Sequence, residues 1–133
     1  MWKELKSEKE LSSFLHRVAF FHDSCLVKFT FISGAYVDSE LSMYPLNDKR
    51  ILRVLFQRQY ADIRSFELEF YGLKHMLFYP TDQHYTCEIE SAEMYMRNGF
   101  VYLDIPSQHI SEENKKVIMN SICATGCRWH IIN

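Results

Sequence analysis

The sequence between residues 92 and 105, AEMYMRNGFVYLDI, restricts the fold of this chain more than any other stretch. Its centre, Asn98-Gly99, is the preferred two-residue type I′ turn, because both turn positions need a positive φ. The turn fixes the register of an antiparallel hairpin. The expected pairs are Met96 with Val101, Tyr95 with Tyr102, Met94 with Leu103, Glu93 with Asp104 and Ala92 with Ile105. Every second pair is apolar, so one face of this ribbon must be buried in a larger sheet.

Four further segments have the alternation, or the β-branched and aromatic content, that favours strands. The plainest alternation is FELEFY at residues 66–71, which predicts a half-buried strand. The expected strands are Leu26–Ile32, Ile51–Tyr60, residues 66–79 with a bulge or bend at Gly72, and Ser121–Ile132 with a break near Gly126. The segment Ile110–Asn114 fits either a short helix or a loop.

One amphipathic helix is expected near the N-terminus, over residues 8–20. Ser7 and Glu10 fit a capping box, in which each side chain bonds the backbone at the other position. An apolar stripe follows at helical spacing, formed by Leu11, Phe14, Leu15 and Val18. One helix followed by six or seven strands predicts a single α+β domain over residues 1–133. The helix should pack on a curled antiparallel sheet or an open barrel.

The composition excludes several classes of function. A net charge of −2 gives no general attraction for nucleic acid or an anionic membrane. The charged N-terminal segment is unlike a signal peptide, so we expect a cytoplasmic protein with four reduced cysteines. Only four glycines are present, and none forms a phosphate-binding loop, so no cofactor is expected. A basic stretch should neutralise a later acidic one across the sheet. The basic residues are Lys49, Arg50, Arg53, Arg58 and Arg64, and the acidic residues are Asp82, Glu88, Glu90, Glu93 and Asp104.

The sequence FHDSC at residues 21–25 contains the residue types of a hydrolase triad. A triad needs side chains that converge from distant segments, whereas neighbours in an extended chain point to opposite faces. We therefore interpret FHDSC as the corner between the helix and the first long strand, where Asp and Ser supply local hydrogen bonds. The alternative is a reactive Cys25 that acts with a histidine from elsewhere.

Two other groups of residues could carry chemistry. Cys123, Cys127 and His130 suggest zinc, but residues four apart in a strand lie roughly 13 Å from each other, too far for one tetrahedral ion. No metal is therefore expected. Glu93 and Asp104 face each other in the predicted hairpin, where like charges destabilise. An arginine could bridge them, both could be solvated, or they could bind a cation or act as a catalytic carboxylate pair.

Residues 34–48 form a long connection that contains two tyrosines, a methionine and three acids. Long connections in compact domains are often functional, and Tyr and Met are favoured in interfaces. The alternative is a loop that folds its aromatic side chains back over the sheet edge. Any protein-binding surface should lie here, with Tyr36, Asp38, Glu40 and Tyr44 as the candidate contacts.

Several segments are similar to those of small uncharacterised bacterial proteins of the immunity type, which are encoded beside polymorphic toxins. The segments are FHDSC (21–25), ISGAY (32–36), MYP (43–45), ILRVLFQRQ (51–59), FELEFYGLKHMLFYP (66–80) and CRW (127–129). The resemblance spans most of the chain and includes no catalytic motif. It implies a non-catalytic protein that binds and blocks a cognate toxin.

The expected function is therefore that of a non-catalytic, cytoplasmic protein-binding module of the immunity or inhibitor type. One alternative is a small enzyme that uses Cys25 or the Glu93–Asp104 pair. Another is a barrel that binds a small apolar ligand in its mouth. The sequence leaves the partner, the oligomeric state and the sheet order open.

Overall fold

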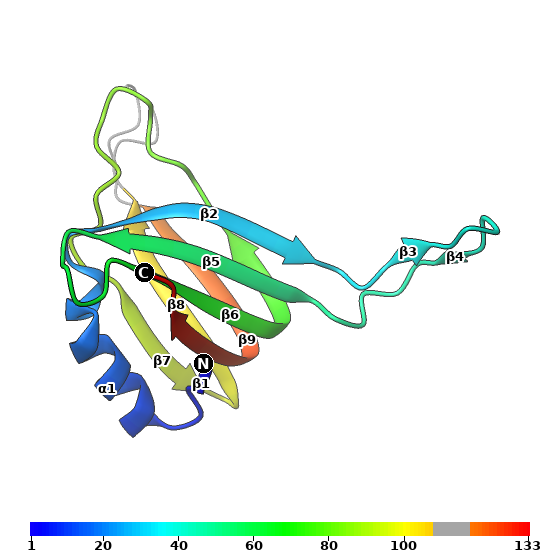
Figure 1. The fold of residues 1–133 in the computed structure, drawn as a ribbon, viewed down its shortest axis with the longest axis horizontal. Helices are drawn as coiled ribbons and strands as arrows, with labels where there is room; N and C mark the ends of the chain where they lie inside the picture. The colour runs from blue at the N-terminus through cyan, green and yellow to red at the C-terminus, as the bar shows by residue number, and fades with distance from the viewer. Residues whose placement is uncertain (108–117) are drawn as a thin grey trace.

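A computed structural model describes residues 1–107 and 118–133, and these form a curled antiparallel sheet with a helix on one side (Figure 1). The expected α+β fold is confirmed. The order of the main strands is β2-β5-β6-β9-β8-β7, with β1 paired to the far end of β9. The bounds are β1 Lys3–Glu4, β2 Ser24–Ile32, β5 Ile51–Arg58, β6 Ser65–Leu77, β7 Glu93–Arg97, β8 Phe100–Ser107 and β9 Ile118–Ile131. Within the described residues the outer strands β2 and β7 do not pair, so the sheet stays open.

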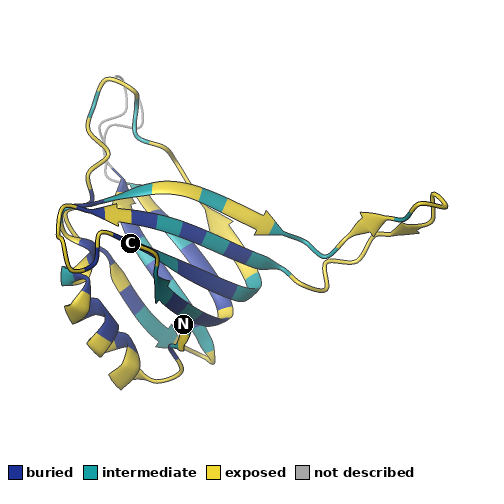
Figure 2. Ribbon diagram, in the orientation of Figure 1, coloured by how far each residue is buried: buried dark blue, intermediate teal, exposed yellow. Residues whose placement is uncertain are grey.

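Helix α1 spans Glu8–Arg17 and begins as predicted. The Ser7 hydroxyl accepts a hydrogen bond from the Glu10 backbone N–H at 3.1 Å. The Glu10 carboxylate accepts one from the backbone N–H of Lys6 at 3.0 Å, one residue before the expected position. The predicted apolar stripe is buried, and Figure 2 shows α1 with one buried and one exposed side.

The helix ends earlier than the predicted residue 20. Residues Ala19–Phe21 form a short 3₁₀ turn with φ values of 52°, 53° and 65°, which lie in the left-handed region. Left-handed residues with a side chain cost about 1–2 kcal/mol each. The turn places Phe21 in the core, where it is completely buried, and this burial offsets part of that cost. Tertiary packing therefore ends the helix before its apolar pattern does.

The hairpin formed by β7 and β8 has the predicted register from Met96–Val101 to Glu93–Asp104. Asn98 and Gly99 have φ values of 53° and 81°, as a type I′ turn requires. The predicted pair of Ala92 with Ile105 lies beyond the end of β7, although both side chains are buried.

Strands β6 and β9 are the longest in the sheet, and they depart from the prediction at their glycines. Gly72 has a φ of 61°, and a register shift follows between Leu73 and His75, so the expected irregularity is present. The expected break at Gly126 is wrong, because β9 continues through it. A Cβ at Gly126 would overlap the ring of Tyr71, its cross-strand neighbour. Gly126 therefore makes room for a side chain instead of ending a strand.

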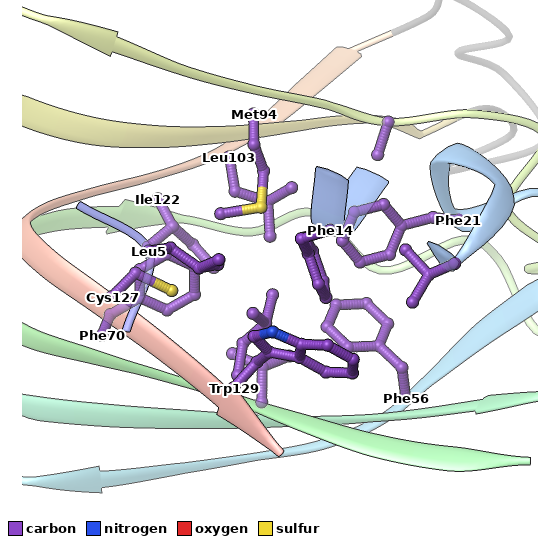
Figure 3. Packing of buried hydrophobic residues seen from close by; sticks show 14 of the residues in the cluster. Leu5, Phe14, Phe21, Phe56, Phe70, Met94, Leu103, Ile122, Cys127 and Trp129 are labelled. Carbon is purple, nitrogen blue, oxygen red and sulfur yellow. The ribbon is translucent and has the colours of Figure 1, made fainter. Parts of the chain in front are cut away.

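The core lies between α1 and the inner face of the sheet, and aromatic rings fill much of it (Figure 3). The Phe14 ring from α1 lies 4.8 Å from the Trp129 ring of β9, and Phe21 lies 5.0 Å from Phe56 of β5. Edge-to-face and tilted contacts of this kind add to the free energy gained by burying the rings. The inside of the curl is therefore packed with side chains near the helix.

The outer face of the sheet carries a row of alternating charges. Cross-strand registers align Arg53 of β5, Glu69 of β6, Arg128 of β9 and Glu4 of β1. The Glu69 carboxylate accepts hydrogen bonds from Arg53 Nε at 2.9 Å and Arg128 Nη2 at 2.7 Å. The expected pairing of the basic stretch with the later acidic one is therefore wrong for Arg53, whose partner lies on the adjacent strand.

The segment Ile110–Asn114 lies outside the described residues, so its predicted helix or loop is not addressed. No helix in the described part of the chain has the length and apolar character needed to cross a membrane.

Candidate functional site

Residues 34–48, here called the arm, form a separate two-stranded hairpin that projects from the body (Figure 1). Strand β3, Tyr36–Val37, pairs with β4, Met43–Tyr44, and this pair is not part of the main sheet. The arm connects the end of β2 to the start of β5. The alternative prediction, a loop folded back over the sheet edge, does not describe this geometry.

The base of the arm is fixed by backbone contacts. The Ser33 carbonyl accepts hydrogen bonds from the N–H groups of Lys49 at 3.0 Å and Arg50 at 3.2 Å. Gly34 has a φ of 101°, and a Cβ there would overlap the Asp48 carboxylate. Only glycine adopts this φ without strain and leaves room for the Asp48 carboxylate. The direction in which the arm leaves the sheet is therefore set by the sequence at its base.

The tip of the arm is closed by Asp38. Its carboxylate Oδ1 accepts hydrogen bonds from the backbone N–H groups of Glu40 at 2.9 Å and Ser42 at 3.0 Å. Its backbone N–H donates to the Ser42 carbonyl at 3.0 Å, and its carbonyl accepts from Leu41 at 3.1 Å. Asp38 was expected as a partner contact. The structure gives it a role in building the turn, which leaves Glu40 as the charged side chain at the tip.

The two predicted tyrosines of the arm lie opposite each other on β3 and β4. The rings of Tyr36 and Tyr44 stack with centroids 4.7 Å apart and an interplanar angle of 15°. The stack holds the two strands together, and both rings remain exposed. Tyr36 and Tyr44 are thus brought together as one exposed aromatic surface, and Glu40 is exposed at the tip.

Four further apolar side chains of the arm are exposed, and none of them was among the predicted contact residues. Val37 and Met43 form the second cross-strand pair, on the face opposite the tyrosines. Leu41 at the tip is 84% exposed, and Leu46 lies in the returning segment. Figure 2 shows the arm as almost entirely exposed. The alternation of Tyr36-Val37 and Met43-Tyr44 around an Asp-Ser turn was the signal that could have revealed a hairpin with two apolar faces.

The FHDSC segment forms the predicted corner. His22 follows the 3₁₀ turn, Asp23 has a φ of 58°, and Ser24 begins β2. His22 Nδ1 donates to the Glu90 carbonyl at 2.8 Å, and the Tyr60 hydroxyl donates to Asp23 at 3.2 Å. Cys25 is half-buried, and no described histidine or acid bonds its thiol. The geometry is that of a corner held by local and cross-strand hydrogen bonds.

Cys127 and His130 of β9 point to opposite faces of the sheet, and Cys123 lies opposite Tyr102, seven residues from His130. Cys127 pairs with Phe70 and faces the core, where burial raises the pKa of its thiol well above the ordinary value. His130 is paired with Glu67 on the outer face, and its Nε2 lies 3.1 Å from the Glu67 carboxylate. Within residues 1–107 and 118–133 no three ligating side chains are grouped as a metal site.

Glu93 and Asp104 are opposite each other, as predicted. Asp104 accepts a hydrogen bond from the Tyr95 hydroxyl at 2.8 Å, and this bond raises the pKa of Tyr95. Neither carboxylate forms an ion pair with any arginine of the described residues, so the expected arginine bridge is wrong. Arg97 instead lies over the Tyr95 ring at 5.2 Å. The like charges are accommodated because Glu93 is exposed to solvent and Asp104 has a tyrosine partner.

A cavity of about 720 Å³ lies between the segment that follows β6 and residues of β2, β8 and β9. Its wall includes apolar side chains of Leu26, Phe78, Ile89 and Ile105, together with Ser107 and Asn120. Asn120 accepts a hydrogen bond from the Tyr79 N–H at 2.6 Å, and the Ser107 hydroxyl donates to the Tyr79 carbonyl at 3.0 Å. These bonds fix the wall of the cavity.

Comparison with protein families, with curated proteins and with solved structures found no match to this chain.

Proposed function

We propose that the protein is a non-catalytic binding module that inserts its arm into a cleft of a partner protein and blocks it. The observation that carries this proposal is an arm with large apolar side chains exposed on both faces. An isolated two-stranded hairpin is at best marginally stable in water, and contiguous exposed apolar surface commonly marks an interaction site. In a complex, the partner would bury the apolar side chains of the arm, which the body of the protein leaves exposed.

The two-faced character of the arm defines the shape of the partner. A hairpin with one apolar face can lie flat on another protein, whereas this arm has Tyr36 and Tyr44 on one face and Val37 and Met43 on the other. A cleft with two walls covers both faces at once. Burial of one such side chain contributes about 1.5–3 kcal/mol. Burial of most of the exposed apolar side chains of the arm supplies enough free energy for specific association after the costs of binding are subtracted.

The charge at the tip defines the electrostatics of the partner. The Glu40 side chain is exposed, while the Asp38 carboxylate is occupied by two backbone N–H groups. A basic residue at the floor of the cleft would pair with Glu40 and would favour association with a basic partner. These features support an inhibitor or immunity type of function in the cytoplasm, where the arm would occlude the partner's own active or binding cleft.

The experiment is a comparison of two baits. Tagged wild-type protein and the variant Leu41→Ser/Met43→Ser are incubated with lysate of the native host, and the bound proteins are identified and quantified by mass spectrometry. We expect one stoichiometric partner with the wild type and a loss of about 30-fold or more with the variant. The melting temperature should not change, because both side chains are exposed.

A matched control replaces two exposed apolar residues elsewhere, Leu77→Ser and Ile132→Ser, each 49% exposed. This control should capture the partner as the wild type does. Equal capture by the wild type and the arm variant would exclude the arm as the binding element.

A second candidate function is the binding of a small ligand, and the cavity beside Phe78 and Ile105 favours it. Its volume of about 720 Å³ is within the range of small-molecule sites. Native mass spectrometry of protein purified from its host would show a bound ligand as added mass. Protein that carries only its own mass would count against this function.

A further inference from the structure

Strand β2 is an open edge of the main sheet, and it runs directly into the arm. It pairs with β5 on one side, and among the described residues only the bridge of Ser24 with Ile89 touches its other side. The opposite edge strand, β7, is covered by α1, and the Glu8 carboxylate of this helix accepts a hydrogen bond from the Met96 N–H. Among residues 1–107 and 118–133, nothing pairs with the backbone of β2 on this side beyond Ser24.

The register shows which backbone groups of β2 face this free edge. The Arg58 N–H donates to the Arg64 carbonyl, so the backbone of Arg58 faces β6. In an antiparallel strand the direction alternates with each residue, so Leu52 and Val54 also face β6, away from β2. Phe31 and Phe29 lie opposite these two residues, and their backbone N–H and C=O groups therefore point away from β5. Ser24 lies opposite Arg58, so its backbone also points away from β5, and its carbonyl accepts a hydrogen bond from the Ile89 N–H at 2.8 Å.

The side chains along this edge have a definite chemistry. The Phe31 ring is 54% exposed, and the Phe29 ring contacts Phe78 at 4.9 Å on the inner side. Lys28 is exposed on the outer side and forms no ion pair with the described residues. The strand contains no acidic residue. A strand laid along this edge would thus meet an apolar side and a positive side.

We propose that the partner adds an extended strand to the edge of β2 at Phe29–Ile32, with apolar side chains toward Phe31 and an acidic side chain toward Lys28. This inference rests on the proposed function, because the same partner holds the arm. Only Ser33 separates the end of β2 from the arm, so the strand and the cleft form one continuous interface. Backbone hydrogen bonds give such strand addition its affinity, and the flanking side chains give it specificity.

The structure favours a different protein over a second copy of this chain as the source of that strand. Because β2 has no acid, a second β2 would leave Lys28 without a counter-charge. A register shift also interrupts the strand between Leu26 and Lys28. Bulges and lysines on an edge strand hinder unselective pairing. Here they limit the edge to a partner that places an acid opposite Lys28.

The test uses substitutions that separate the edge from the arm. Phe31→Pro removes an N–H that faces the free edge and leaves the bonds of β2 with β5 intact, as proline is tolerated at such edge positions. Phe31→Val keeps the N–H and an apolar side chain, and serves as its matched control. Both are used as baits beside the wild type and Leu41→Ser/Met43→Ser, and thermal unfolding verifies that each is folded.

We expect Phe31→Pro to lose about tenfold or more of the captured partner, and Phe31→Val to retain it. Lys28→Glu should lose a similar amount through charge reversal, while Lys9→Glu, on the exposed side of α1, should not. Hydrogen exchange on the wild type gives an independent measurement. The amides of Phe29 and Phe31 should exchange rapidly in the free protein and become protected in the purified complex.

The outcomes distinguish the two proposals. Loss of the partner with the arm variant but not with Phe31→Pro, together with unprotected Phe29 and Phe31 amides, would overturn the edge proposal and leave the arm proposal in place. Capture by all variants, or no stoichiometric partner for the wild type, would overturn both. A wild-type dimer in sedimentation that Phe31→Pro dissociates would identify a second copy as the occupant and overturn the proposal of a different protein.

Discussion

Replacing Glu69 by glutamine should destabilise the protein more than any other conservative change on the outer face of the sheet. The Glu69 side chain is 4% exposed and lies between two guanidinium groups, those of Arg53 and Arg128. Its two oxygens each accept a charge-assisted hydrogen bond, and Arg128 Nε adds a further one at 2.8 Å. In the Glu69→Gln variant the amide would place an NH₂ donor against one of these guanidinium donors.

The size of the effect follows from these contacts. A hydrogen bond to a charged group contributes about 1.5–3 kcal/mol. The side chains of Arg53 and Arg128 are 41% and 34% exposed, so water can still solvate them when the carboxylate is removed. The lower end of that range therefore applies. We therefore expect a loss of about 1.5–2 kcal/mol in the free energy of unfolding. With an unfolding entropy of about 2.1 cal/mol/K per residue, this lowers the melting temperature by about 5–7 °C.

The assay is urea unfolding followed by tryptophan fluorescence, with circular dichroism as a second probe. Glu67→Gln is the matched control, because Glu67 lies two residues away on the same face and its carboxylate has a single polar partner among the described residues, His130. This control should cost less than about 1 kcal/mol. If Glu69→Gln and Glu67→Gln destabilise the protein equally, the row of charges does not stabilise the sheet in the way described.

Three further outcomes are expected. Gly126→Ala should cost about 1–3 kcal/mol, because its methyl group displaces the Tyr71 ring, and the cost measured by chemical unfolding should shrink in a Tyr71→Ala background. Burial, and then the hydrogen bond to Glu4, raise the pKa of Tyr71 to about 12. The folded state thus holds this proton more tightly than the unfolded state, so its contribution to stability is complete below about pH 10 and declines as the pH rises toward 12. Titration at 295 nm should show a late tyrosine fraction that is smaller in Tyr71→Phe, and an equal late fraction in the two proteins would contradict this. Under native conditions Cys87, which is exposed, should react with a thiol reagent first, and Cys127 only on unfolding; a rapidly reacting Cys25 would instead revive the enzymatic hypothesis.

The secondary structure that depends on local chemistry could be predicted from the sequence. The Asn98-Gly99 turn determines its own φ values, and the stripe that begins at Leu11 identifies the buried side of α1. The order of the strands could not be predicted, because β9 pairs with β6, β8 and β1, and two of these lie far from it in the chain. The role of Gly126 could not be predicted either, because this glycine makes room for the ring of Tyr71, which lies on another strand.

The exposed arm lies where the sequence predicts a binding surface, and its role in binding stays a prediction. Tyr36, Glu40 and Tyr44 are exposed on the arm, as a contact surface requires. Asp38 serves the turn, a role that becomes visible only when the backbone N–H groups of Glu40 and Ser42 are in place. The edge position of β2 could not be predicted either, since an alternating strand has the same sequence pattern at the edge of a sheet as near its centre.

The position of β9 has a consequence for how the chain folds. It is the last strand in chain order, yet it lies in the middle of the sheet and joins β2-β5-β6 to β8-β7. Until residues 118–131 are available, the sheet exists only as two separate pieces, each with an additional unpaired edge at β6 or β8. Pairings over such long sequence separations are slow to form. A nascent chain that stops before β9 would expose two additional strand edges, and such intermediates are prone to aggregation. Successful folding of this protein therefore depends on how quickly its last strand finds the gap between β6 and β8.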